Sequence, residues 1–276
     1  MSFNSVNTNR QAVFALQSLN QTNSELSGVQ KRVSTGYRVA DAKDDGGAFA
    51  VAQAVRSDVA GVTAVGEQLG GVKGVLQTTF AALSQVSDTM KQVRATLTRL
   101  ADGAINGDQR AQYNTQYTLL RNQISDFIDD ATYNGRTLLS TVGPTGGNIT
   151  GIRNEGGGTF TVNAVDGATL KLAAAPPATA VLAQGMIASG GAFDVIDGLI
   201  STALNQFGAS MQYVENQITY NSKKVDAMND GLGALVDADL AKESSKLQAL
   251  QTRQQLGIQT LGIANQGPQV LLSLFR

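Results

Sequence analysis

The chain has 276 residues and a formal net charge of −1, and it contains no cysteine, histidine or tryptophan. These absences exclude disulfides, thiol or imidazole catalysis and the commonest zinc ligands, and the near-zero charge gives no reason to expect nucleic-acid binding. Charged residues make up only 16% of the chain, below the usual quarter, so its surface is either poorly solvated or largely covered by another molecule.

Helix-breaking residues divide the chain into two arms and a centre. The four prolines leave residues 1–143 and 178–267 free of proline, and the glycines cluster between Gly143 and Gly191. Because proline and clustered glycine break helices, the chain is predicted to be mainly α, with two long helical arms around a short irregular centre.

The N-terminal stretch has a sparse apolar pattern amid Gln, Asn, Ser and Thr. Its apolar positions are Leu16, Leu19, Leu26, Val29 and Val33. So little apolar area does not support a stable isolated helix. We expect this end to be labile alone and to gain order from partners or from copies of itself.

The first arm continues into regular heptads. Apolar residues recur in alternating steps of four and three, which is the seam of a coiled coil or a long bundle helix, and only Thr79 is polar among Val72, Leu76, Thr79, Leu83, Val86, Met90, Val93, Leu97 and Leu100. A second helix repeats the pattern from Tyr113 to Ala131, after a predicted loop at 102–108. Seams of about 30 residues predict rods of about 45 Å.

The centre carries turn and strand patterns. Asn134-Gly135 is a hairpin-turn signal. Alternation over 159–162 and 169–172, separated by 165–167, predicts a β-hairpin.

The second arm repeats the heptads from Phe207 to Leu235, through Ile218 and Val225. The last stretch keeps the spacing with half of the seam polar, at Leu240, Ser244, Leu247, Gln251, Gln254, Ile258, Leu261 and Asn265. It ends in an apolar tail, residues 271–276, which is an association hazard in a monomer.

No targeting signal is visible. The first 20 residues lack the apolar core of a secretory signal, and no stretch approaches 18 apolar residues, so no transmembrane helix is expected. These rules alone predict a cytosolic protein. The Asp44-Asp45-Gly46-Gly47 segment matches no calcium-binding spacing, and no cofactor or catalytic site is predicted.

Several short motifs, in the right order at both ends, resemble bacterial flagellin. The resemblance covers roughly residues 1–142 and 193–276 and is carried by Asn7-Thr8-Asn9, Ser34-Thr35-Gly36 with Arg38, Ala42-Lys43-Asp44-Asp45, Tyr133-Asn134-Gly135 with Leu138-Leu139, Asp237-Ala238-Asp239, Gln254-Gln255, Ala264-Asn265-Gln266, and Pro268-Gln269 with Leu271-Leu272-Ser273-Leu274. Gly46-Gly47 stands where the family commonly has alanine. The centre is short, so this would be a form without large outer domains.

The resemblance implies a helical filament assembly with three parts. Residues 1–34 and 236–276 would form an inner terminal coiled coil, residues 35–142 and 193–235 a helical rod domain, and residues 143–192 a short outer β-hairpin segment. Inner packing and polymerisation are assigned to Leu16, Leu19, Leu26, Val33, Leu247, Ile258, Leu261, Leu272, Leu274 and Phe275. The inter-domain connection is assigned to Ser34, Thr35, Gly36, Arg38, Asp44 and Asp45, and the rod seam to Leu83, Val86, Met90, Val93, Leu97, Ile218 and Val225.

The implied function is a structural subunit of the extracellular flagellar filament, which replaces the cytosolic prediction. The resemblance implies export by flagellar type III secretion without a cleaved signal peptide. The implied partners are further copies of the chain, a filament cap protein, a hook–filament junction protein and a cytosolic export chaperone on the C-terminal helix, with no nucleic acid and no membrane insertion. The alternative is that the chain is itself the junction protein; an enzyme or a secreted coiled-coil effector is remote.

Overall fold

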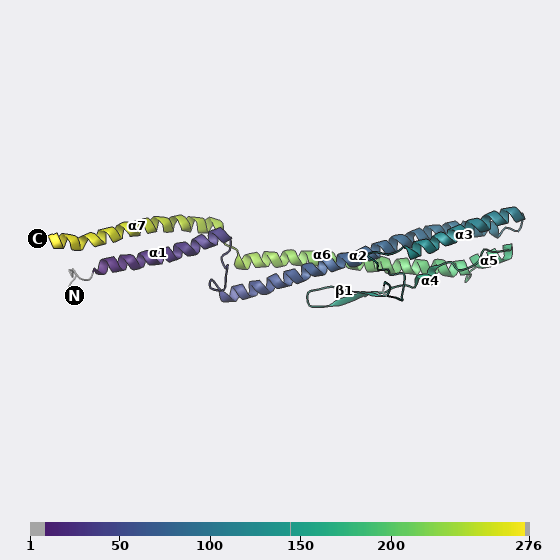
Figure 1. Cartoon of the computed structure of the whole chain (residues 1–276), viewed down its shortest axis with the longest axis horizontal. Helices are drawn as coiled ribbons and strands as arrows, with labels where there is room; N and C mark the ends of the chain where they lie inside the picture. The colour runs from purple at the N-terminus through teal and green to yellow at the C-terminus, as the bar shows by residue number, and fades with distance from the viewer. Residues whose placement is uncertain (1–8, 144, 274–276) are drawn as a thin grey trace. The chain divides into compact units, whose positions relative to one another are not determined.

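The structure, a computed structural model, describes residues 9–143 and 145–273, with side chains described as far as residue 266. The fold is mainly α, as predicted, with one small antiparallel sheet in the described residues (Figure 1). Its elements are α1 (Arg10–Thr35), α2 (Gly46–Leu100), α3 (Gly107–Asp129), β1 (Ile149–Ile152), β2 (Thr159–Val162), α4 (Gly167–Leu170), α5 (Ala180–Ile187), α6 (Ala192–Val236) and α7 (Leu240–Ser273).

The chain forms two compact units. The first takes in the described residues up to Ser57 and from Ala227 onward, and the second is Asp58–Asp226. Helices α2 and α6 contribute residues to both.

The core of the second unit follows the predicted seam of α2. Leu83, Val86, Met90, Val93 and Leu97 are fully buried, and so is the polar Thr79, whose hydroxyl donates to the Val75 carbonyl at 2.9 Å. Tyr117 and Ile124 of α3 and Phe207 and Val214 of α6 join the same apolar cluster. Of the remaining seam positions of α6, Ile218 and Val225 are half-buried.

Local signals set the ends of the α2–α3 hairpin. Helix α2 stops at Leu100, and α3 begins with a capping box in which Asn106 and Gln109 bond each other's backbone N–H. The predicted loop over 102–108 is therefore confirmed to within a residue or two. The Asn134-Gly135 turn is also confirmed: both residues have positive φ, and Tyr133 and Arg136 pair across it.

The predicted pairing of the β-hairpin was wrong. Residues 159–162 form β2, but its partner is β1, with Ile149 opposite Val162 and Ile152 opposite Thr159. Residues 167–170 form α4 instead, because the Asp166 carboxylate caps that helix at the Ala168 N–H and Leu170 is fully buried. Alternation alone did not distinguish the two segments, and Gly151 interrupts the pattern of β1.

Side chains from α6 hold the tip of this hairpin. The Arg153 carbonyl accepts hydrogen bonds from Gln217 Nε2 at 3.0 Å and Asn221 Nδ2 at 3.2 Å, and Glu155 pairs with Lys224. Asn221 is the polar member of the α6 seam, and these bonds satisfy its buried amide.

Candidate assembly site

Helices α1 and α7 lie side by side in the first unit and run antiparallel (Figure 1). Three polar contacts join them along their length: Asn9 Nδ2 donates to the Ala264 carbonyl at 2.7 Å, Gln254 Nε2 donates to Asn23 Oδ1 at 2.8 Å, and Arg32 lies 3.3 Å from the Glu243 carboxylate. The pair is therefore held at both ends and near its middle.

The contact faces of this pair are small and partly polar. Of the described side chains in α1 only Thr22 and Val29 are buried, and in α7 only Leu250. The less exposed positions of α7 are Glu243, Leu247, Leu250, Gln254, Gly257, Leu261 and Ala264, again in steps of four and three. Leu240, Ser244, Gln251, Ile258 and Asn265 of the predicted seam point to solvent instead, so that seam was wrong at these positions.

The large apolar side chains of the pair lie mostly outside the contact. Phe14 and Ile263 are each 70% exposed, and Val13, Leu16, Leu256 and Ile258 are also exposed. Uncovered leucine, isoleucine and phenylalanine on both helices form a surface that burial against another molecule would stabilise.

The residues assigned to inner packing therefore divide into two sets. Leu19, Leu26, Val33, Leu247 and Leu261 are half-buried between the two helices, whereas Leu16 and Ile258 face outward. Leu272 lies in helical backbone whose side chains are not described, and Leu274 and Phe275 fall outside the described residues.

The far end of the pair carries a compensating hydrogen bond. Pro268 has no N–H, so within α7 the carbonyl four residues earlier, at Ala264, loses its usual helical donor. Asn9 supplies that donor through Nδ2 while its Oδ1 caps α1 at the Ala12 N–H. One asparagine near the start of the chain thus completes both helices.

At the other end of the pair is a joint, where the connection from α1 to α2 lies beside the connection from α6 to α7. Residues 36–39 lie antiparallel to residues 235–238: Arg38 N–H donates to the Val236 carbonyl at 2.7 Å, and Ala238 N–H donates to the Gly36 carbonyl at 2.9 Å. Beneath them Val39, Ala52 and Val236 form a small buried cluster. Backbone hydrogen bonds and apolar contacts therefore hold the two connecting segments together.

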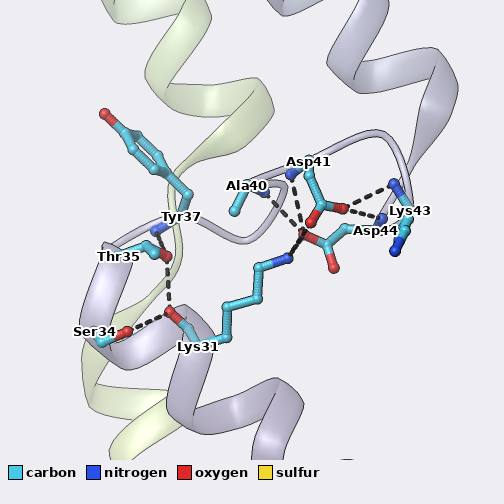
Figure 2. A network of polar contacts seen from close by, with 8 residues as sticks. All are labelled: Lys31, Ser34, Thr35, Tyr37, Ala40, Asp41, Lys43 and Asp44. Carbon is cyan, nitrogen blue, oxygen red and sulfur yellow. Dashed lines mark hydrogen bonds and ion pairs between the residues drawn. The ribbon is translucent and has the colours of Figure 1, made fainter.

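An ion-pair network stabilises the connection from α1 to α2 (Figure 2). Lys31 Nζ lies 2.7 Å from Asp41 Oδ2 and 2.9 Å from Asp44 Oδ2, and Asp44 Oδ2 also accepts from the Ala40 and Asp41 N–H groups. The hydrogen bonds from Lys31 lower the pKa of both carboxyls, and the bonds to Asp41 and Asp44 raise the pKa of Lys31. The paired charges hold residues 40–44 against the end of α1.

The remaining residues assigned to the connection act on helix ends. Gly36 ends α1 with a left-handed φ of 75°, and the Asp45 carboxylate accepts from the Ala48 N–H at the start of α2. The Ser34 and Thr35 hydroxyls donate to the Lys31 carbonyl, and the Arg38 guanidinium donates to the Leu235 carbonyl. The structure therefore brings all six to this joint.

Sequence reasoning missed several residues of this site. Lys31, Asp41, Arg32 and Glu243 were not singled out, because each charge has its partner at least ten positions away. The inward stripe of α1 was readable: Ala12, Ala15, Leu19, Thr22, Leu26, Val29 and Val33 keep steps of three and four. It went unrecognised because only the larger apolar residues of this stretch were considered, so Ala12, Ala15 and Thr22 were left out.

Comparison with known proteins identifies the class to which this fold and surface belong. The family model for the bacterial flagellin N-terminal helical region matches residues 6–143, and that for the C-terminal helical region matches residues 193–275. Flagellin FljK of Caulobacter vibrioides is 37% identical over the full length of both chains, and a Brucella melitensis flagellin is 34% identical over 99% of each. A Bacillus cereus flagellin crystal structure matches 66% of this chain and 94% of its own, with 18% identity and a TM-score of 0.36.

This chain belongs to the bacterial flagellin family. It is a structural protein, a subunit of a flagellar filament, and its length matches that of its C. vibrioides relative, so it is a short form.

Proposed function

We propose that this flagellin polymerises through the exposed apolar side chains of its α1–α7 pair. The observation that carries the proposal is the exposure of Phe14, Leu16, Ile258 and Ile263 on a pair that buries only three of its described side chains. Copies of the same chain are the partner that a filament supplies, and covering these side chains is worth about 1.5–3 kcal/mol each.

The proposed organisation keeps the three predicted parts. Residues 1–34 with 236–276 form the inner coiled coil, residues 35–142 with 193–235 form the rod, and residues 143–192 form the outer segment. The backbone hydrogen bonds between residues 36–39 and 235–238 support a domain boundary near these residues, since they hold the two connecting segments together.

Electron microscopy of seeded polymerisation tests the proposal. Purified chain added to filament fragments should elongate them into long tubes, and the protein truncated after Gln266 should fail to elongate while its helix content is almost unchanged. Normal filaments from the truncated protein would contradict the role given to Leu272, Leu274 and Phe275. If the full chain never elongates seeds, the proposal is wrong and the hook–filament junction protein is the favoured alternative.

The exported state is part of the same proposal. We propose that the chain leaves the cell by flagellar type III secretion without a cleaved signal peptide, as its membership of the flagellin family suggests. Its proposed partners on this route are a cytosolic chaperone on the C-terminal helix, the junction protein and the filament cap. The exposed apolar side chains of α7 support a chaperone, since they would otherwise associate in the cytosol.

Binding of nucleic acid and insertion into a membrane are not part of the proposed function. The net charge of −1 gives no electrostatic reason to expect nucleic-acid binding. One segment, Ala180–Val236, is long and apolar enough to cross a membrane by length and composition alone. The early part of α6 carries Asp194 and Asp197 and buries Phe193 and Ile200 in the protein's own core, which favours a helix of a soluble bundle.

A further inference from the structure

Helix α2 is not uniform in composition along its length. Of the 17 residues from Val59 to Val75, five are glycine and six are valine or threonine, whereas residues 76–100 contain no glycine. Glycine is among the poorest helix formers, and valine and threonine lose side-chain freedom in a helix. The helix is therefore intrinsically weak over residues 61–74, which we call the glycine segment.

The glycine segment is packed on one side only. Its inward side chains, such as Val65 and Leu69, are buried in the core of the second unit. On the other side, no described atom from another part of the chain lies within 4 Å of where a Cβ would stand at Gly66, Gly70 or Gly71. Alanine would fit at all three positions and would form a stronger helix, so packing does not explain these glycines.

The glycines at the two ends of the segment contact other parts of the unit. A Cβ at Gly61 would lie 3.2 Å from the Cβ of Glu155, at the tip of the β1–β2 hairpin. A Cβ at Gly74 would lie 2.7 Å from Cζ of the Tyr133 ring, beside the Asn134-Gly135 turn. Because glycine has no side chain, the hairpin tip and the Tyr133 ring can each lie directly against α2.

Helix α6 bonds the same hairpin tip. Gln217 and Asn221 donate hydrogen bonds to the Arg153 carbonyl, and Lys224 pairs with Glu155. The tip therefore connects α6 to the start of the glycine segment, and loss of its bonds to α6 would free Glu155 to leave Gly61.

We propose that the hairpin tip and the Tyr133 ring keep the glycine segment helical, and that the segment opens locally when either contact is lost. Because the helix is weak here, its stability depends on these neighbours more than in the glycine-free part of α2. Leu83 and Leu97 of that part are fully buried, so the opening should stop before them. The device gives α2 one place where it can bend while the core of the unit stays closed. It belongs to the folded chain and does not depend on polymerisation.

Amide hydrogen exchange of the monomer tests the role of the hairpin tip. The double variant Gln217→Ala with Lys224→Ala removes two of the bonds from α6 to the tip and leaves strong helix formers in α6. Amides of residues 62–73 should then exchange at least about five-fold faster, while those of residues 83–97 stay within about two-fold of the unmodified chain.

The matched control changes two exposed neighbours on the same helix. Asn216→Ala with Lys223→Ala removes the same kinds of side chain without touching the described bonds to the tip, and exchange of residues 62–73 should not change. Unchanged exchange of these amides in the double variant of Gln217 and Lys224 would overturn the role of the tip, and so would an equal acceleration in the control.

Two glycine substitutions four residues apart test the other contact by the sign of their effects. Gly70→Ala adds a methyl group in open space and should slow exchange of residues 62–73, because alanine is the better helix former. Gly74→Ala should instead accelerate it by about three-fold or more, because the methyl group displaces the Tyr133 ring. Slower exchange in both variants would show that the ring does not stabilise the segment, and faster exchange in both would show that helix propensity does not limit it.

Discussion

The two compact units use the same spacing of apolar residues and bury it to different degrees. In the second unit α2, α3 and α6 enclose a seam in which Leu83, Val86, Met90, Val93 and Leu97 are fully buried. In the first unit only Thr22, Val29 and Leu250 are buried among the described side chains of α1 and α7, and Phe14, Ile258 and Ile263 lie in solvent. Two helices alone have only one shared face, so a second layer must come from elsewhere. Folding alone buries the seam of the second unit, whereas under the proposed function further copies would cover the exposed apolar side chains of the first.

The largest effect is expected from the enclosed seam. Leu83→Ala removes a fully buried side chain and leaves a cavity, so the free energy of unfolding of the monomer should fall by about 2–5 kcal/mol. Urea unfolding followed by circular dichroism measures it. The control Leu119→Ala, on α3 of the same unit and 64% exposed, should change the free energy by no more than about 0.5 kcal/mol. Equal losses for the two variants would contradict the role of the enclosed seam in the stability of this unit.

The opposite behaviour is expected from the exposed face of α7. Ile258→Ala should leave the unfolding of the monomer within about 0.5 kcal/mol of the unchanged chain, because the side chain is 57% exposed. In the filament the lost burial of about 1.5–3 kcal/mol should raise the critical concentration for polymerisation roughly ten-fold or more. Sedimentation of filaments at a series of protein concentrations measures this. A Gln259→Ala control should leave the critical concentration nearly unchanged, and an unaffected Ile258→Ala filament would argue against this face as an interface.

The hydrogen bond between Asn9 and Ala264 is expected to matter by about 1 kcal/mol. Asn9→Asp keeps the oxygen that caps α1 and loses the Nδ2 donor, so amide exchange in α1 and α7 should become about five-fold faster. Pro268→Ala restores an N–H within α7 that can reach the Ala264 carbonyl. Asn9→Asp should therefore cost much less in the Pro268→Ala background. Equal costs in the two backgrounds would show that the missing proline N–H is not what Asn9 compensates.

The smallest effects are expected at the joint, because its charges are exposed and solvent weakens surface ion pairs. Asp44→Asn removes one of the two negative charges that pair with Lys31, and it should make tryptic cleavage after Arg38 a few times faster. Asp45→Asn keeps a side-chain oxygen to cap α2 and lies outside the Lys31 network, so it should leave this rate unchanged. Cleavage at the same rate in both variants would contradict a stabilising role for the network.

The same network sets a pH dependence. Because the pKa values of Asp41 and Asp44 are lowered from 3.8, their stabilisation is present above about pH 3.8 and is lost as the pH falls through the lower folded values. The pKa of Lys31 is raised from 10.5, so its contribution is complete below that pH and is lost as the pH rises through the folded value. Protection of the Ala40, Asp41 and Lys43 amides, corrected for intrinsic exchange, should be flat between about pH 5 and 10 and fall as the pH drops below 3.8. Unchanged protection in acid would show that backbone contacts alone hold these residues.

Much of the second unit could be predicted from the sequence, because its apolar positions are many and strictly spaced. The seam of α2, the loop before α3 and the Asn134-Gly135 turn each follow from a local rule. The partner of β2 does not follow from a local rule, since residues 149–152 and 169–172 are both short candidate strands. Only the helix cap at Asp166 and the burial of Leu170 distinguish the second segment from a strand. A local sequence pattern predicts a helix or a strand, whereas the pairing of strands depends on which segment packs into the core.

The assembly site was less predictable for a different reason. Leucine and isoleucine residues lie on its outward faces as well as between the helices, and alanine, threonine and glutamine share the inward stripe, so the pattern differs from that expected of a helix in a monomer. Leu16 and Ile258 were selected as packing residues from family resemblance, and the structure shows them outside the intramolecular contact. The Lys31 network was invisible because a lysine in a helix and two aspartates in a loop carry no spacing rule that links them.

Amide hydrogen exchange compared between monomer and filament tests the central claim most directly. If other copies complete the α1–α7 pair, amides of both helices in the monomer should exchange at least a hundred-fold faster than those of residues 72–100 in α2, and polymerisation should slow them to a similar level. The amides of α2 should be protected in both states. Terminal helices already as protected as α2 in the monomer, or still exchanging rapidly in the filament, would contradict the account.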